Sequence, residues 1–304
     1  MTTLVLEDAC TRQLRLLVEA RRTFVQDRTL FSNRLGATLK CYYPLAWEWV
    51  GQDLTTALAL DFLARWPNLA KLQGAKAGTL RAFFYGHNSR SEERIEQRLH
   101  SLAQAVPLTQ DAALIEPLQL QVQMLVQQLR ALNKAIAAYD AQIKAVFAQH
   151  KNASLFKQLP GCGAVLAPRL AAAFGTQQAN FSSARELLCF SGVAPVQKQS
   201  GTQKVVQFRW ARPIFCHQTM VEFAKCSLAQ CGWARLFFEA QVAKGKSRWA
   251  AIRAVAFKWL RILWKCWRTG TPYQEAQYLR SLHRDGVGLY RSLYADLPTL
   301  EKSV

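Results

Sequence analysis

The chain has 304 residues and is strongly basic, with 39 Lys and Arg against 20 Asp and Glu and a formal net charge of +19. Half of its residues are hydrophobic and Gly and Pro are few, which excludes a disordered, collagen-like or low-complexity protein. No uncharged apolar run reaches the roughly 18 residues of a membrane span. A cationic surplus of this size on a folded protein predicts a polyanionic partner, because such surfaces attract phosphates at long range.

The eight cysteines form no Cys-x-x-Cys pair, and Cys226 and Cys231 have no second pair of Cys or His at zinc-finger spacing. Residues 1–10 lack the basic start of a secretory signal. We therefore expect reduced thiols, no bound metal and a cytoplasmic protein that does not enter a membrane.

The N-terminal part of the chain has the periodicity of helices. Apolar residues recur at helical spacing from Cys10 to Lys40, and Pro44 ends this helix because proline disfavours helical geometry at the preceding residue. A second helical block runs from Leu54 to Arg65. Residues 85–89 (Tyr-Gly-His-Asn-Ser) predict a turn and a domain boundary.

A narrow apolar stripe follows between Leu118 and Val146. Its residues are spaced alternately four and three apart, as in the a and d positions of a coiled coil: Leu118, Val122, Leu125, Leu129, Leu132, Ile136, Tyr139, Ile143 and Val146. Such a seam requires one partner helix. The partner is either the segment Ser91–Val106 of the same chain, which gives a helical hairpin, or a second copy of the chain.

The basic residues concentrate near the C-terminus, where 13 Lys and Arg but only two acids, Glu222 and Glu239, lie between Ser200 and Gly270. Before this region, residues 159–167 (Leu-Pro-Gly-Cys-Gly-Ala-Val-Leu-Ala) resemble the turn of a helix-hairpin-helix motif. Gly161 and Gly163 would allow a tight turn whose backbone N–H groups meet a DNA phosphate at a helix start. The alternative is an ordinary turn between packed helices.

A short strand is predicted over Lys204–Trp210, after a turn at Ser200-Gly201. A serine beside a glycine is usually only part of a turn. Here, however, cations surround it that could hold a phosphodiester and stabilise transition-state charge, so Ser200 is a candidate nucleophile. These cations are Lys198, Lys204, Arg209 and Arg212. No general base is identifiable nearby, and His217 is expected to pack or to face solvent.

The residues from Lys246 to Arg268 predict an amphipathic helix. Its apolar face is expected in the core, and its cations fall on a separate arc of roughly 140° at about 100° per residue. The absence of interleaved acids favours phosphate binding over a merely solvated face. The candidate phosphate ligands of this region are Lys244, Lys246, Arg253, Lys258, Arg261 and Lys265.

Motifs for nucleotide or metal binding are missing from the sequence, which has no P-loop, no Gly-x-Gly-x-x-Gly, no His-Glu-x-x-His and no Asp-x-x-Asp. Magnesium-dependent nucleases need clustered carboxylates. Because the acids are scattered, as Glu92, Glu93 and Glu96 illustrate, a self-contained metal nuclease is not expected.

Five ordered blocks give the chain a resemblance to a known family. They are Leu-Val-Glu-Ala-Arg-Arg (17–22), Asp-Arg-Thr-Leu-Phe-Ser-Asn-Arg-Leu (27–35), Leu-Pro-Gly-Cys-Gly-Ala-Val-Leu-Ala-Pro-Arg-Leu (159–170), Ser-Gly-Val-Ala-Pro-Val-Gln-Lys-Gln-Ser-Gly (191–201) and Lys-Gly-Lys-Ser-Arg-Trp-Ala-Ala-Ile-Arg-Ala (244–254). In these blocks the chain resembles the DEDD transposases of the insertion sequence 110 type, which are bridge-RNA-guided relatives of the Piv invertases. The resemblance extends from about residue 11 to residue 280.

The resemblance implies a RuvC-type nuclease domain with Asp-Glu-Asp-Asp metal ligands, a coiled coil and a helical transposase domain. It also implies that Ser200 attacks DNA covalently, in a composite site completed by acids of another subunit, while a guide RNA selects the DNA. The family's last acidic pair, Asp-x-x-Asp-Ala, would precede Thr11. Asp8 lacks that context and Glu7 does not replace it, so we expect the metal-binding core to be missing and Mg²⁺ to bind only with that domain.

The sequence therefore predicts a mainly α protein, a truncated transposase that binds DNA and structured guide RNA but does not recombine DNA alone. The expected parts are trailing helices of the RuvC-type domain (1–88), a coiled-coil arm (89–152) that forms a homo-oligomer, a transposase domain with a small β-hairpin (153–280) and a tail (281–304). One alternative is a non-catalytic or dominant-negative subunit that joins full-length copies. Another is a helix-hairpin-helix repair protein unrelated to transposition.

Overall fold

A computed structural model describes residues 5–294, except for the side chains of Lys198, Gln203, Lys204, Ser292 and Tyr294. The protein is mainly helical, as predicted, and its strands form one two-stranded sheet within that range. The chain forms two compact units. We call residues 20–140 the arm unit, and the residues up to Glu19 together with those from Ala141 onward the C-terminal unit. None of the helices from residue 5 to 294 is long and apolar enough to cross a membrane.

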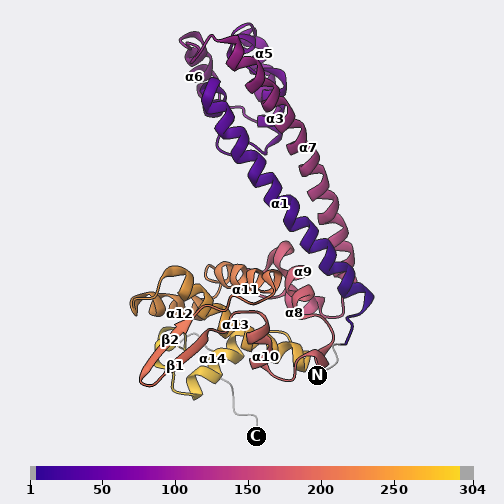
Figure 1. The fold of residues 1–304 in the computed structure, drawn as a ribbon, viewed down its shortest axis with the longest axis vertical. Coiled ribbons are helices and arrows are strands. Elements are labelled where there is room, and N and C mark those ends of the chain that lie inside the picture. Colours follow the sequence, from indigo (N-terminus) through magenta and orange to yellow (C-terminus); the bar gives the residue numbers. More distant parts are fainter. Residues whose placement is uncertain (1–4, 295–304) are drawn as a thin grey trace. The chain divides into compact units, whose positions relative to one another are not determined.

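The arm unit is a pair of long helices with short helices packed at one end (Figure 1). Helix α1 ends at Tyr42, and α2 begins at Pro44 after the single residue Tyr43. Proline suits the first turn because it has no N–H to leave unbonded. The side chains of Thr56, Asn68 and Ser91 accept hydrogen bonds from backbone N–H groups at the starts of the helices that follow them. The helices are α1 (Ala9–Tyr42), α2 (Pro44–Val50), α3 (Ala57–Arg65), α4 (Leu69–Gln73), α5 (Ala77–Gly86), α6 (Glu92–Ala103) and α7 (Ala112–Gln149).

The apolar seam of α7 is buried within a single chain. Val122, Leu129 and Ile136 are each at most 5% exposed. Helix α1 covers part of the seam, because the Phe24 ring lies 5.3 Å from that of Tyr139. The segment proposed as the intrachain partner contributes Ile95 and Leu102 of α6 to the core that holds the first half of the seam. The sequence prediction of the seam's partner omitted α1, and the spacing needs no second copy to explain it.

The C-terminal unit is built around α13, and the indole rings of Trp259 and Trp267 on this helix lie in its core. Trp259 is fully buried, and its Nε1 donates a hydrogen bond to the Ser227 hydroxyl at 2.8 Å. Its ring lies 4.9 Å from that of Trp233 and 5.0 Å from that of Phe223, which brings α11 and α12 against α13. The elements are α8 (Ala153–Lys157), α9 (Gly163–Phe174), η1 (Gln178–Asn180), α10 (Ala184–Phe190), β1 (Val196–Ser200), β2 (Gln203–Gln207), α11 (Ile214–Ser227), α12 (Gly232–Ala243), α13 (Arg248–Thr269), α14 (Glu275–Arg284), η2 (Gly288–Tyr290) and α15 (Arg291–Tyr294).

The two units do not coincide with the three parts and tail expected from the sequence. Residues from the expected parts 1–88 and 89–152 share one core in the arm unit, because their apolar faces are completed by one another. In the expected tail, Leu282 and Tyr290 are buried in the C-terminal unit. Residues 295–304 of that tail lie outside the described residues.

Candidate nucleic-acid interface

The turn between α8 and α9 contains two glycines in different environments. Both have positive φ, 75° at Gly161 and 54° at Gly163, a conformation that glycine adopts without a steric cost. The Gly161 N–H donates a hydrogen bond to the Gln230 side chain at 2.7 Å, and a Cβ there would lie 2.6 Å from the Cys226 carbonyl oxygen. Gly161 thus packs the turn against α11. Gly163 is exposed and open at the start of α9, so the proposed phosphate contact is available there and not at Gly161.

The hairpin predicted around Ser200 is present, and Ser200 is the last residue of its first strand, next to the turn. Strands β1 and β2 are antiparallel, with Ser200 paired to Gln203, and Gly201 between them has a φ of 58°. Ser200 is exposed, and none of the described side chains hydrogen-bonds to its hydroxyl. Lys198 and Lys204 lie in the paired strands, but their side chains are outside the described residues. The Ser200 hydroxyl is therefore accessible to a large ligand such as DNA.

At the base of the hairpin, arginines gather around one aromatic ring. The Arg212 guanidinium lies 4.0 Å from the centre of the Phe208 ring, and that of Arg253 lies 5.2 Å from it. Arg212 Nη1 also donates to the Arg209 carbonyl oxygen at 2.5 Å. His217 of α11 meets the same ring edge to face, with the ring centres 5.4 Å apart. We call Phe208, Arg209, Arg212, His217 and Arg253 the hairpin-base cluster.

Burial and like charge perturb the ionisation of this cluster. Burial, reinforced by the charge of Arg253, lowers the pKa of Arg212. Burial, with the charge of Arg212 next in size, lowers the pKa of His217 to about 4, so this imidazole is neutral at pH 7. No carboxylate in the described part of the chain forms a salt bridge with Arg209, Arg212 or Arg253. The cluster therefore offers uncompensated positive charge to an anion.

The cations of α13 and of the segment just before it are divided between the surface and the interior. Arg261, Lys265 and Lys244 are exposed. Lys258 instead points inward, because its Nζ donates to the Tyr290 hydroxyl at 2.9 Å and lies 4.2 Å from the centre of the Phe237 ring. Burial, together with the charge of Arg261, lowers the pKa of Lys258. Lys258 thus has a partner within the fold, unlike the open phosphate ligand expected from the sequence.

Lys246 is exposed just before α13. Its Nζ donates a hydrogen bond to the Gln241 side-chain oxygen at 2.6 Å. The helix begins after Ser247, whose hydroxyl accepts from the Ala250 N–H at 3.3 Å. Lys246 is therefore tethered beside the helix start while its charge faces solvent.

The acids at the N-terminus do not offer the magnesium site that the family resemblance implies. The Glu7 carboxylate accepts hydrogen bonds from the backbone N–H groups of Thr176 at 2.7 Å and Gln177 at 3.1 Å. Asp8 accepts from the Thr11 N–H at 2.8 Å, and its pKa is lowered to about 2 by hydrogen bonds from Thr176 and Thr11 that outweigh its partial burial. Among residues 5–294, no three His, Cys, Asp or Glu are grouped to hold a metal ion. The described residues do not fit Mg²⁺.

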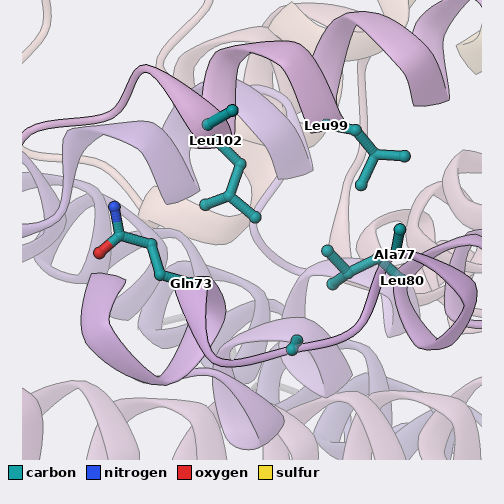
Figure 2. Close-up of a pocket in the computed structure, with 7 residues that line it drawn as sticks. Gln73, Ala77, Leu80, Leu99 and Leu102 are labelled. Carbon is teal, nitrogen blue, oxygen red and sulfur yellow. The ribbon is translucent and has the colours of Figure 1, made fainter.

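The arm unit contains a pocket of about 350 Å³, shown in Figure 2. Leu80, Leu99 and Leu102 line it with small alanines. Its one polar side chain, Gln73, donates through Nε2 to the Ala105 carbonyl oxygen at 2.9 Å. The lining holds no titratable or nucleophilic group, so it supplies no chemistry.

Sequence reasoning missed two residues at the base of the hairpin. Phe208 was treated only as part of a strand, although it organises the hairpin-base cluster, and Trp210 was not singled out, although it is 83% exposed. The alternation of aromatic and basic residues in Phe208-Arg209-Trp210-Ala211-Arg212 was the signal that could have identified them.

One segment of the C-terminal unit is similar to a family of transposases. Residues 153–238, which run from the start of α8 into α12 and include the hairpin, match the model of the Transposase IS116/IS110/IS902 family. This match and three relatives show that the segment is similar to IS110/IS116/IS902-type transposases.

Three relatives are similar over a longer stretch. An insertion element IS900 uncharacterized 42 kDa protein of Mycobacterium paratuberculosis is 26% identical over 275 residues, which cover 87% of this chain and 66% of the relative. An insertion element IS110 uncharacterized 43.6 kDa protein of Streptomyces coelicolor is 25% identical, covering 90% of this chain and 67% of the relative. A mini-circle putative transposase for IS117 of the same organism is 28% identical, covering 65% and 49%. The chain thus spans between about half and two thirds of these relatives.

Proposed function

We propose that this chain is the DNA-binding and strand-joining part of an insertion-element transposase, and that Ser200 is its nucleophile. The observation that carries the proposal is the position of Ser200: it is exposed at the strand end next to a hairpin turn, inside the segment that matches the transposase family. Transposases act on DNA, and the uncompensated cations of the hairpin-base cluster and of α13 support a polyanionic substrate. Structured guide RNA is a second proposed partner, because it presents the same phosphates.

In the proposed step, the Ser200 Oγ attacks the phosphorus of a DNA phosphodiester. An Oγ–P bond forms, the bond from phosphorus to one deoxyribose oxygen breaks, and that oxygen leaves with a proton while the serine proton passes to a base. Nearby cations would stabilise the charge on the pentacovalent phosphorus, as Arg and Lys do in other phosphoryl transfers. The described side chains supply no base in contact with Ser200, so we assign both proton transfers, from the serine and to the leaving oxygen, to solvent or to groups outside the described side chains.

A covalent-adduct experiment tests Ser200. DNA spanning the end of the native element, with a bridging sulfur at each candidate scissile phosphate, provides a leaving group that needs no proton. We expect the unmodified chain to form a covalent adduct with this DNA and Ser200→Ala to form none while retaining DNA affinity. Thr202→Ala is the matched control, because Thr202 is an exposed hydroxyl in the adjoining turn, and it should keep the adduct. An equal adduct yield in Ser200→Ala would refute the assignment.

The alternative of a subunit that joins longer copies through a coiled coil has lost its main support. The seam of α7 that suggested it is already buried inside one chain, at Val122, Leu129 and Ile136. A homo-oligomer would need another surface. If such an assembly forms, we expect it to survive substitutions of the seam that leave the fold intact.

A further inference from the structure

Trp210 is the most exposed large apolar side chain of the described residues, at 83%. Other indoles of the C-terminal unit, those of Trp233, Trp259 and Trp267, are at most 1% exposed and form its core. An isolated exposed apolar residue is common. Trp210 differs because it lies between Arg209 and Arg212 in the sequence, four residues before Ile214, which is 62% exposed.

Contacts with Phe208 and Arg212 hold Trp210 in place. Its ring meets the Phe208 ring edge to face, with the centres 5.2 Å apart and the planes at 86°. Its carbonyl oxygen accepts a hydrogen bond from Arg212 Nη1 at 3.3 Å, and the same guanidinium lies over Phe208. These contacts fix the backbone and one edge of the indole while leaving most of its surface in solvent. Such a rigid exposed ring loses little entropy on binding a flat ligand.

The charges around Trp210 select the class of ligand. Arg209 and Arg253 belong to the hairpin-base cluster, which has no carboxylate partner in the described part of the chain. The Nε atoms of Arg209 and Arg212 are buried without a hydrogen-bond acceptor among the described residues. An apolar protein surface would leave this positive charge uncompensated on desolvation, whereas a phosphodiester would neutralise it. An aromatic ring among arginines is the arrangement that binds a base and its flanking phosphates.

We propose that Trp210 stacks on an unpaired nucleobase of the DNA, while Arg209 and Arg253 bind the phosphates beside it. This inference rests on the proposed function and adds to it a preference for DNA with unpaired bases. A base inside a duplex has both faces covered by its neighbours, so an indole can stack on it only where the stack is opened. The site would therefore recognise a melted or extruded position in the DNA that Ser200 attacks.

The experiment compares two duplexes that differ only in a four-nucleotide unpaired bubble carrying 2-aminopurine. We expect Trp210→Ala to lower affinity for the bubble DNA by about tenfold or more, as stacking losses do, and affinity for the paired duplex by less than about twofold. The 2-aminopurine fluorescence should be quenched by the unmodified chain and not by Trp210→Ala. Trp210→Phe should retain most of both signals. Trp249→Ala is the matched control, because Trp249 is an exposed indole, at 56%, in the first turn of α13.

A substitution of Arg261 and Lys265 separates this inference from the proposed function. Arg261→Ala with Lys265→Ala should lower the affinity for both DNAs alike, because it removes only phosphate contacts. If the unmodified chain binds neither DNA, the proposed function itself fails. If Trp210→Ala weakens both DNAs equally or neither, base stacking is refuted. If Trp210→Ala instead changes the oligomeric state in sedimentation velocity and leaves both affinities unchanged, Trp210 belongs to a protein interface. This result would also refute base stacking.

Discussion

At the scale of single residues, His217 makes the stability of the folded chain depend on pH. Its imidazole lies against Phe208, with the guanidinium groups of Arg212 and Arg253 as the charged groups facing it. Its folded-state pKa of about 4 is below the ordinary 6.5, so between these values the unfolded chain binds the proton and the folded chain does not. The folded state is thus fully stable above about pH 6.5 and is destabilised as pH falls towards 4.

We predict that the free energy of unfolding falls by on the order of 2–3 kcal/mol between pH 7 and pH 4 through His217 alone. Urea unfolding of the chain at several pH values measures it. His217→Gln should remove this part of the pH dependence, whereas His100→Gln should keep it, because His100 is exposed in the arm unit. An unchanged pH profile in His217→Gln would show that the imidazole is not held neutral by the fold.

At the scale of elements, the turn between α8 and α9 contains one glycine that packs, Gly161, and one that is open to a ligand, Gly163. Gly161→Ala places a methyl group 2.6 Å from the Cys226 carbonyl oxygen at a positive φ, and we predict a loss of more than about 2 kcal/mol of stability. Gly163→Ala meets no atom within 4 Å, so only backbone strain of about 1 kcal/mol is expected. Chemical denaturation of both variants checks this order. Equal losses would contradict the packing role of Gly161.

Most elements near the candidate site could be predicted from the sequence, because their signals are local. The amphipathic pattern of Lys246–Arg268 agrees with α13, and the Ser200-Gly201 turn before an alternating segment agrees with the hairpin. The partner of the α7 seam could not be predicted, because α1 is separated from it by about a hundred residues and its apolar face resembles that of other helices. Tertiary packing, and not periodicity, decides which faces meet.

At the scale of the whole molecule, the positive charge is only partly available to a ligand. Lys258 looked equivalent to Arg261 on a helical wheel, but the fold covers it with Tyr290 from the segment expected to be a tail. Glu7 and Asp8, which looked like isolated acids, instead bind the chain around Thr176. These contacts join residues far apart in the sequence, so composition and spacing could not reveal them. The matched family segment nevertheless includes Ser200, the residue that the sequence identified.

The most direct test of the account measures how strongly the affinity for a paired DNA duplex depends on salt. If six or more phosphates are bound, affinity should fall on the order of 10³-fold between 50 and 200 mM salt. Arg261→Ala with Lys265→Ala should reduce the slope of log affinity against log salt by about 2. Lys71→Ala with Lys76→Ala removes two exposed cations of the arm unit and should leave the slope unchanged. A flat salt dependence, or the same slope in all three proteins, would contradict DNA binding through the cations of α13.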